Sequence, residues 1–186
     1  LSLIYAIKNP SRVISLTLRG IFLCRKFELL WFYQYGASEI FPDEFEKYIS
    51  VIPTNERDNL IKSFYKYLTS SNAKVRSEAS FAWTNWELST SHLIKKESGI
   101  GKNKANLFAD AFARIECHYF YNKIFLEDNF ILNNIKIIKT IPTTIIQGRY
   151  DVVCPVRSAW DLNKKLKHSK LTIVDNAGHS MSEIGI

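Results

Sequence analysis

The chain has 186 residues, of which 46% are apolar and 23% are charged, so disordered, collagen-like and low-complexity classes are excluded. No apolar stretch approaches the roughly 20 residues that cross a bilayer, so we expect no membrane partner. The net charge of +7 is distributed along the sequence in short groups such as Lys95-Lys96 and Lys164-Lys165. Since nucleic-acid binding requires clustered charge, we expect a solvated surface and no nucleic-acid partner.

The cysteines indicate the cellular compartment. Cys24, Cys117 and Cys154 are odd in number, widely spaced and form no C-x-x-C pair. This pattern argues against a zinc ribbon or a disulfide framework and favours a reducing compartment, so we expect a cytoplasmic protein. We also expect no metal and no other cofactor, because Glu116-Cys-His118 lacks the spacing of an H-E-x-x-H site.

The first predicted elements are a helix and a strand. Leu1 to Ile7 has a helical pattern with no residue before it to cap the helix, and no targeting signature is present, so we expect a piece of a longer chain. Asn9-Pro10 should end this helix, because proline disfavours the helical conformation of the residue before it. Val13 to Leu18 is short and rich in β-branched residues, which predicts a buried strand.

Helical spacing replaces the strand pattern from about Phe27 to Phe130. The polar stretch from Lys95 to Asn106 is predicted to separate two of these helices. Residues three or four positions apart define three apolar helix faces. They are Leu60, Ile61, Phe64 and Leu68; Val75, Ala79, Ala82, Trp83 and Trp86; and Phe108, Phe112, Ile115 and Tyr119.

Strands return after about Ile131. Thr143 to Ile146 and Leu171 to Val174 are short apolar runs, and a helical pattern lies between them. Strand, helix and strand in this order form the crossover unit of a parallel sheet. We therefore predict an α/β fold with an inserted all-helical domain, in which residues 1–27 and 131–186 form the core and residues 28–130 form the insertion.

Each C-terminal strand is followed by a titratable residue. Asp151 comes just after the first strand and His179 just after the second. Carboxyl ends of parallel strands meet at one edge of a sheet, so the two side chains should lie close together. An acid that orients an imidazole is two thirds of a Ser-His-Asp triad, but spacing alone fits a turn aspartate and a surface histidine equally well. No G-x-S-x-G motif is present, and neither Ser2 nor Ser180 has its flanking residues.

Four motifs resemble the proline iminopeptidases (prolyl aminopeptidases), which are serine peptidases of the α/β-hydrolase class with a helical cap. The motifs are Leu18-Arg-Gly-Ile-Phe22, Phe112-Ala-Arg-Ile-Glu-Cys-His-Tyr-Phe120, Gln147-Gly-Arg-Tyr-Asp-Val-Val-Cys-Pro155 and Asp175-Asn-Ala-Gly-His-Ser180. Shorter segments, such as Trp83-Thr-Asn-Trp-Glu87, are similar in the same order, so the resemblance covers nearly the whole chain. It implies an α/β-hydrolase fold and a nucleophilic serine about five residues before Leu1.

The resemblance also implies roles for individual residues. Asp151 and His179 match the acid and the base of the triad. Glu87 and Glu116 match the two cap glutamates that bind the free α-amine of the substrate. The remaining matches are to positions that line the active site or the pocket for the proline ring: Arg19, Phe22, Phe32, Val153 and Cys154. Phe32 stands where some members carry tyrosine.

These implied roles agree with the chemistry of the residues. An exopeptidase that requires an unblocked amino terminus needs fixed negative charge near the ammonium group, which two carboxylates supply. The expected partner is accordingly a peptide with a free N-terminal proline.

Other interpretations remain open. The chain could be a different capped α/β-hydrolase, such as an esterase or an amidase, although a neutral substrate does not need paired glutamates. It could also be a catalytically inactive remnant, or a basic helical interaction module, for which clustered Lys and Arg would be required. Without the resemblance, Glu87 and Glu116 would read as ordinary structural ion-pairing residues.

Overall fold

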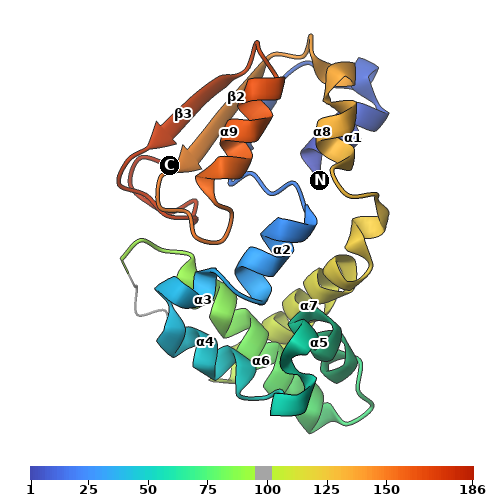
Figure 1. Cartoon of the computed structure of the whole chain (residues 1–186), viewed down its shortest axis with the longest axis vertical. Coiled ribbons are helices and arrows are strands. Elements are labelled where there is room, and N and C mark those ends of the chain that lie inside the picture. The colour runs from blue at the N-terminus through green and yellow to red at the C-terminus, as the bar shows by residue number, and fades with distance from the viewer. Residues whose placement is uncertain (95–101) are drawn as a thin grey trace. The chain divides into compact units, whose positions relative to one another are not determined.

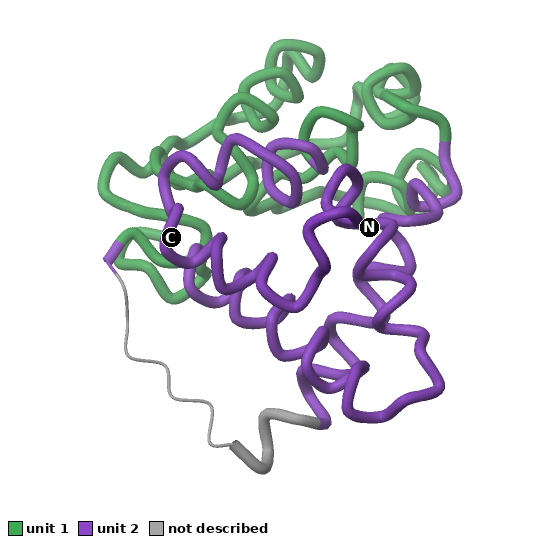
Figure 2. The backbone as a smooth tube through the Cα atoms, turned by 60° about the horizontal axis from the view of Figure 1, so that its bottom comes forward, with its two compact units in different colours: residues 1–28, 91–93, 127–186 green, residues 29–90, 94–126 purple. Residues whose placement is uncertain are grey.

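The computed structural model describes residues 1–94 and 102–186, so much of the polar stretch from Lys95 to Asn106 lies outside the described residues. The chain divides into two compact units, coloured separately in Figure 2. Unit 1 comprises residues 1–28, 91–93 and 127–186, and unit 2 comprises residues 29–90 and 94–126. The first boundary falls inside helix α2 (Lys26–Tyr33).

Unit 1 contains a parallel sheet of three strands in the order β1-β2-β3 (Figure 1). The strands are β1 (Leu16–Arg19), β2 (Thr143–Gly148) and β3 (Lys170–Val174). The two C-terminal strands were predicted to within one or two residues. The first was predicted three residues too early, because Val13 to Ser15 precede the pairing, which starts where Leu16 lies opposite Thr143.

Helices cover the sheet of unit 1 and complete its core. The short α1 (Ser2–Lys8) packs against α8 (Phe130–Asn134) and the 3-10 turn Ile135–Ile138, while α9 (Val156–Lys165) packs on β2 and β3 (Figure 1). The α9 residues that face inward are small or aliphatic, with Ala159 and Leu162 fully buried. The predicted strand, helix and strand crossover is confirmed by β2, α9 and β3.

Unit 2 contains only helices and turns among its described residues. The α-helices that follow α2 are α3 (Ala37–Ile40), α4 (Pro42–Ile49), α5 (Leu60–Leu68), α6 (Ala73–Thr90) and α7 (Lys102–Tyr121). Local sequence explains where several begin. Pro42 occupies the first turn of α4, where its missing N–H costs nothing. The Asn59 side chain caps α5 by accepting a hydrogen bond from the Lys62 N–H at 3.0 Å.

Aromatic rings form the centre of unit 2. Trp83 and Trp86 are buried in α6, as the second predicted helix face requires. Tyr48 stacks on Phe64 with ring centroids 4.5 Å apart, and Tyr33 stacks on Trp83 at the same separation. Offset and edge contacts between such rings add stability beyond the burial of their area.

The third predicted helix face has a different orientation from the first two. Phe108, Ile115 and Tyr119 on α7 are exposed. The buried face of α7 consists instead of the small residues Ala109, Ala113 and Cys117. Small side chains allow α7 to approach α5 and α6 closely, so they take the core positions despite their lower hydrophobicity.

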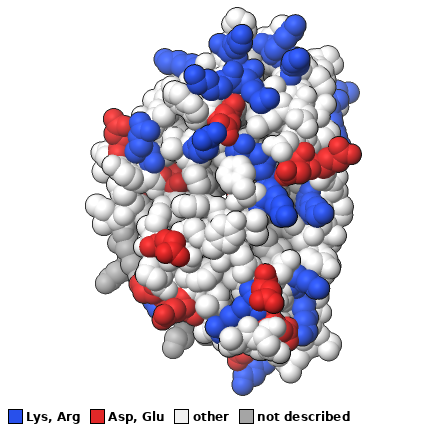
Figure 3. Space-filling model, in the orientation of Figure 1, with Lys and Arg blue, Asp and Glu red and all other residues white. Residues whose placement is uncertain are grey.

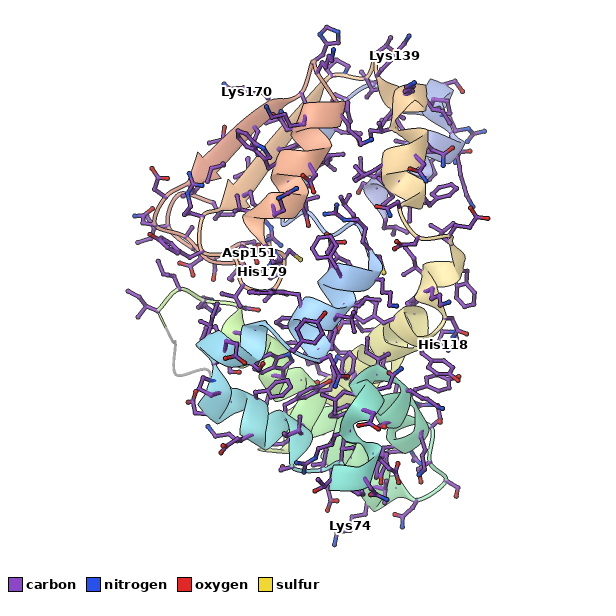
Figure 4. The ribbon with its side chains drawn as sticks, viewed as in Figure 1. Lys74, His118, Lys139, Asp151, Lys170 and His179 are labelled. Atoms are coloured by element: carbon purple, nitrogen blue, oxygen red, sulfur yellow. The ribbon has the colours of Figure 1, made fainter. Side chains whose placement is uncertain are left out.

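Basic side chains gather at one edge of unit 1. The segments that precede the three strands contain no Asp or Glu over residues 1–15, 129–142 and 162–169, and parallel strands bring these segments to the amino edge of the sheet. Lys139 and Lys170 mark this edge in Figure 4, and Figure 3 shows Lys and Arg concentrated there. Basic residues that lie in short groups along the sequence therefore come together at this edge in unit 1.

None of the helices in the described parts of the chain has both the length and the apolar character needed to cross a bilayer.

Candidate active site

Asp151 lies in the turn that follows β2, at the carboxyl edge of the sheet. Its side chain is only 1% exposed, and its carboxylate accepts hydrogen bonds from three residues. The Cys154 N–H donates to Oδ1 at 2.7 Å, the Gln147 amide donates to Oδ2 at 2.7 Å, and the His179 ring meets Oδ1 and Oδ2 at 3.1 and 2.9 Å. A buried carboxylate that accepts several hydrogen bonds is held in one orientation.

His179 lies in the loop that follows β3, and its side chain is 23% exposed. The Asp151 carboxylate faces Nδ1, so Nδ1 carries the proton of the neutral ring and Nε2 is the nitrogen that can exchange a proton with a reactant. Figure 4 shows the two labelled side chains next to each other at the carboxyl edge. The structure therefore brings together the two residues that sequence spacing predicted to meet.

Backbone contacts fix the loop that carries His179. The N–H groups of His179 and Ser180 donate to the Ser91 carbonyl at 3.0 and 2.8 Å. Gly148, the last residue of β2, comes so close that a Cβ placed on it would lie 2.1 Å from the Gly178 carbonyl oxygen. Only glycine allows this approach, which draws the loop after β3 against the end of β2.

The end of β1 supports the same imidazole. The Arg19 guanidinium donates to the His179 carbonyl oxygen. Gly20, with a positive φ of 55°, leaves room for the ring, because a Cβ there would lie 3.1 Å from His179 Cε1. Of the residues implied to line the site, Arg19 therefore contacts His179, while Phe22 follows in the loop after β1 and is half-buried.

The implied proline-pocket residues of unit 1 lie in the turn after Asp151. Cys154 is buried, and its backbone binds both Asp151 and Gln147, with its carbonyl accepting the Gln147 amide at 2.9 Å. Val153, its neighbour, is half-buried. Cys154 thus holds the turn through its main chain, a contact that the sequence pattern alone does not indicate.

Glu87 and Glu116 come together inside unit 2. The Tyr33 hydroxyl donates to Glu87 Oε1, and the Trp83 indole N–H donates to Glu116 Oε2 at 2.9 Å. A side-chain hydrogen bond also joins the two glutamates. Such a bond needs a proton on one of the carboxyl groups, because a carboxylate only accepts.

Burial raises the pKa of Glu87 well above 4.5, and the negative charge of Glu116 and the hydrogen bond to it raise this pKa further. The hydrogen bond from Tyr33 acts in the opposite direction but is outweighed. Burial and the two glutamates also raise the pKa of Tyr33 well above 10.0, so Tyr33 stays a neutral donor. The pair is therefore an acidic site in which Glu87 keeps its proton to a higher pH than a free glutamate does.

Phe32 contributes to the same aromatic surroundings. It is buried, its ring lies edge-on to Tyr33 with centroids 4.9 Å apart, and its carbonyl accepts the Trp86 indole N–H at 3.1 Å. Sequence reasoning missed two polar residues, Gln147 and Tyr33, that bind the candidate site residues directly. A glutamine within a buried apolar strand is the signal that could have identified the first.

Comparison with known proteins places this geometry in a family. The model of the alpha/beta hydrolase fold matches residues 1–185. The chain belongs to the α/β-hydrolase family. The parallel sheet of unit 1 and its covering helices agree with that fold.

Individual α/β-hydrolases are similar along the whole chain. A protein of Leptolyngbya boryana named a probable proline iminopeptidase is 55% identical over 100% of this chain and 58% of its own length. Proline iminopeptidases of Arabidopsis thaliana and Xylella fastidiosa are 46% and 47% identical, over 100% and 98% of this chain and 50% and 59% of their own lengths. The chain thus spans half to three fifths of the length of these relatives.

Proposed function

We propose that the full-length protein is a serine aminopeptidase that releases N-terminal proline from peptides. The observation that carries this proposal is the pair of neighbouring glutamates, buried Glu87 and half-buried Glu116, in an aromatic environment. A hydrolase of neutral substrates has no use for two adjacent carboxyl groups there, whereas an ammonium group needs several acceptors. The names of the relatives support the same substrate class.

The proposed reaction is acyl transfer to a serine in the part of the full-length protein that this chain does not cover. His179 Nε2 would take the serine proton as the oxygen attacks the prolyl carbonyl, and would then pass it to the leaving amine. Asp151, bound to Nδ1, holds the ring in the required tautomer and stabilises the imidazolium. Water would release the proline by the same two proton transfers.

Recognition of the substrate would divide between charge and shape. The proline ring is apolar and rigid, so the apolar side chains of Phe32, Val153 and Cys154, which the resemblance assigns to it, suit it better than hydrogen-bond donors. In this proposal residues 28–130 act as the cap that supplies the glutamates, and residues 1–27 and 131–186 supply the acid and the base.

The experiment compares two substrates in the full-length protein. Glu116→Gln and Glu87→Gln keep the side-chain shape and remove the acid. Each should lower kcat/KM for a proline amide by roughly 10²–10³-fold, because loss of a charge partner of a buried ion costs about 3–5 kcal/mol. Hydrolysis of a small neutral ester, which has no ammonium group, should stay within about twofold of the original rate.

Glu46→Gln is the matched control, because Glu46 is an exposed glutamate of α4 in the same unit. It should leave both substrates unaffected. A parallel loss on proline amide and ester would mean that the glutamates are structural, and the aminopeptidase assignment would lose its basis. A loss on neither substrate would remove the glutamates from the site altogether.

A further inference from the structure

Gln147 is a fully buried amide at the end of β2, and all of its hydrogen-bonding groups are used. Its Oε1 accepts the Ile21 N–H at 2.8 Å. Its Nε2 donates to Asp151 Oδ2 at 2.7 Å and to the Cys154 carbonyl at 2.9 Å. The side chain thus joins the loop after β1 to the acid and to the turn that follows the acid.

The partners determine which way the amide points. The Ile21 N–H can only donate, so it needs the amide oxygen, whereas the Asp151 carboxylate and the Cys154 carbonyl accept, so they need the NH₂ group. An ionised glutamate at this position would place a carboxylate oxygen, which only accepts, against the Asp151 carboxylate and the Cys154 carbonyl, which also accept. An aliphatic residue would leave the Ile21 N–H and these two acceptors without this partner. The site therefore requires a side chain with one acceptor and two donors.

The neighbouring contacts show why the position of this carboxylate matters. Arg19 and Gly20 immediately precede Ile21. Arg19 donates to the His179 carbonyl oxygen, and Gly20 leaves room for the His179 ring. Through Gln147, the same loop also holds the partner of that ring. The end of β1 and the loop after it therefore contact both members of the pair. Arg19 and Gly20 lie against His179, and Ile21 is linked to Asp151 through Gln147.

We propose that Gln147 is the positioning residue of this acid–histidine pair, fixing the Asp151 carboxylate in the orientation that the His179 ring uses. Its effect on turnover rests on the proposed function, but its effect on the pair does not. Gln147 acts through Asp151 and takes no part in proton transfer.

The test uses the full-length protein and two variants with different chemistry. Gln147→Met removes the amide but keeps an unbranched side chain of similar length. Gln147→Glu keeps the shape and, once protonated, regains one donor toward Asp151. A carboxyl group buried beside another carboxylate takes up a proton more readily than one in water, so lowering the pH should restore the lost bond in the second variant alone.

The first readout is the low-field proton resonance of the hydrogen-bonded His179 Nδ1–H, identified by its displacement in Asp151→Asn. We expect Gln147→Met to lose or broaden this resonance at every pH. Gln147→Glu should lose the resonance at about pH 9 and regain it at about pH 6. This readout needs no substrate, so it tests Gln147 even if the protein does not hydrolyse proline amides.

The second readout is turnover of a proline amide. Gln147→Met should lower kcat by about ten- to a hundredfold with KM within about twofold, because a displaced acid misplaces the base without altering substrate binding. For Gln147→Glu, the ratio of its kcat to that of the original protein should rise as the pH falls.

Thr143→Val is the control, since Thr143 is buried at the other end of the same strand and donates to the Ile141 carbonyl. It should change thermal stability without moving either readout. The proposal is wrong if Gln147→Met keeps the resonance, or if Gln147→Glu shows no recovery at low pH. Unfolding of Gln147→Met would leave the pH response of Gln147→Glu to decide between these results.

Discussion

At the scale of single residues, the candidate site depends on polar side chains inside apolar surroundings. Asp151 and His179 could be predicted from their places after consecutive strands, because chain order and the parallel sheet determine which edge they share. Gln147 and Tyr33 could not be assigned in this way, since their roles depend on which groups of distant segments face them. Ile21 and Glu87, for example, are 126 and 54 positions away from these two residues.

Glu87 makes the stability of the protein depend on pH. Its pKa is raised well above 4.5 in the folded state, mainly by burial. Between pH 4.5 and that raised value the folded form therefore binds more protons than the unfolded form, so the free energy of unfolding should fall as the pH rises. Glu87→Gln cannot ionise, and it should be more stable than the original protein at the upper end of this range.

Thermal unfolding of the full-length protein at a series of pH values measures this effect. A gain of 1 kcal/mol would appear as a rise in Tm of about 2–4 °C. The exposed Glu46→Gln variant should follow the original protein at every pH. If the Tm of the original protein and the Tm of Glu87→Gln change in parallel with pH, ionisation of Glu87 does not lower the stability of the folded protein.

At the scale of elements, strands were easier to predict than helix orientation. The runs that became β2 and β3 are short, apolar, rich in β-branched residues and bounded by Pro142, Gly148 and Asn176, a combination that favours strands. The α7 face was misjudged because periodicity marks an apolar stripe without saying what covers it. Ala109, Ala113 and Cys117 are buried through close helix packing, which depends on partners far away in the sequence.

The start of α2 is joined to α9 by a buried ionic network. The Arg25 guanidinium lies 3.0 Å from Asp161 Oδ2, 3.1 Å from Ser158 Oγ and 3.4 Å from Glu28 Oε1. The side chains of Arg25 and Glu28 are 8% and 2% exposed. Arg157 binds the other oxygen of Asp161 at 2.8 Å, but its side chain is 72% exposed.

Two arginines that share one partner therefore provide a matched comparison. Arg25→Met leaves the Glu28 carboxylate buried without its cation and should cost about 3–5 kcal/mol of unfolding free energy. Arg157→Met removes a solvent-exposed ion pair with Asp161, one helical turn away on α9, and should lower the free energy of unfolding by about 0.3–0.5 kcal/mol. Urea unfolding of both variants in the full-length protein gives the two values, and equal costs would show that burial does not control the strength of this network.

At the scale of the whole molecule, the sheet of unit 1 is open on both sides. Among the described residues, β1 and β3 each pair only with β2. Unpaired strand edges promote association with other chains. The α/β class followed from the order of the predicted elements, whereas the gathering of lysines at the amino edge emerged only once the strand order was known.

We therefore expect residues 1–186, produced alone, to associate and to bind hydrophobic dyes. They should not turn over a proline amide, because the proposed nucleophilic serine is not among them. Size-exclusion chromatography and a chromogenic assay check both points against the full-length protein. A monomer that unfolds cooperatively in urea, or clear turnover, would contradict this expectation.

In the proposed aminopeptidase, the proton that Glu87 retains through its raised pKa has a further consequence for the energetics of recognition. An ammonium group that replaces this proton beside the Glu87 and Glu116 carboxyl groups would release the proton to the solvent. Under the proposed function, binding of the substrate would then be an exchange of one cation for another, and the site would not have to hold two bare negative charges in aromatic surroundings. The affinity for an amino terminus would therefore rise with pH even while the amine itself remains fully charged, and part of the heat of binding would belong to whichever buffer receives the proton.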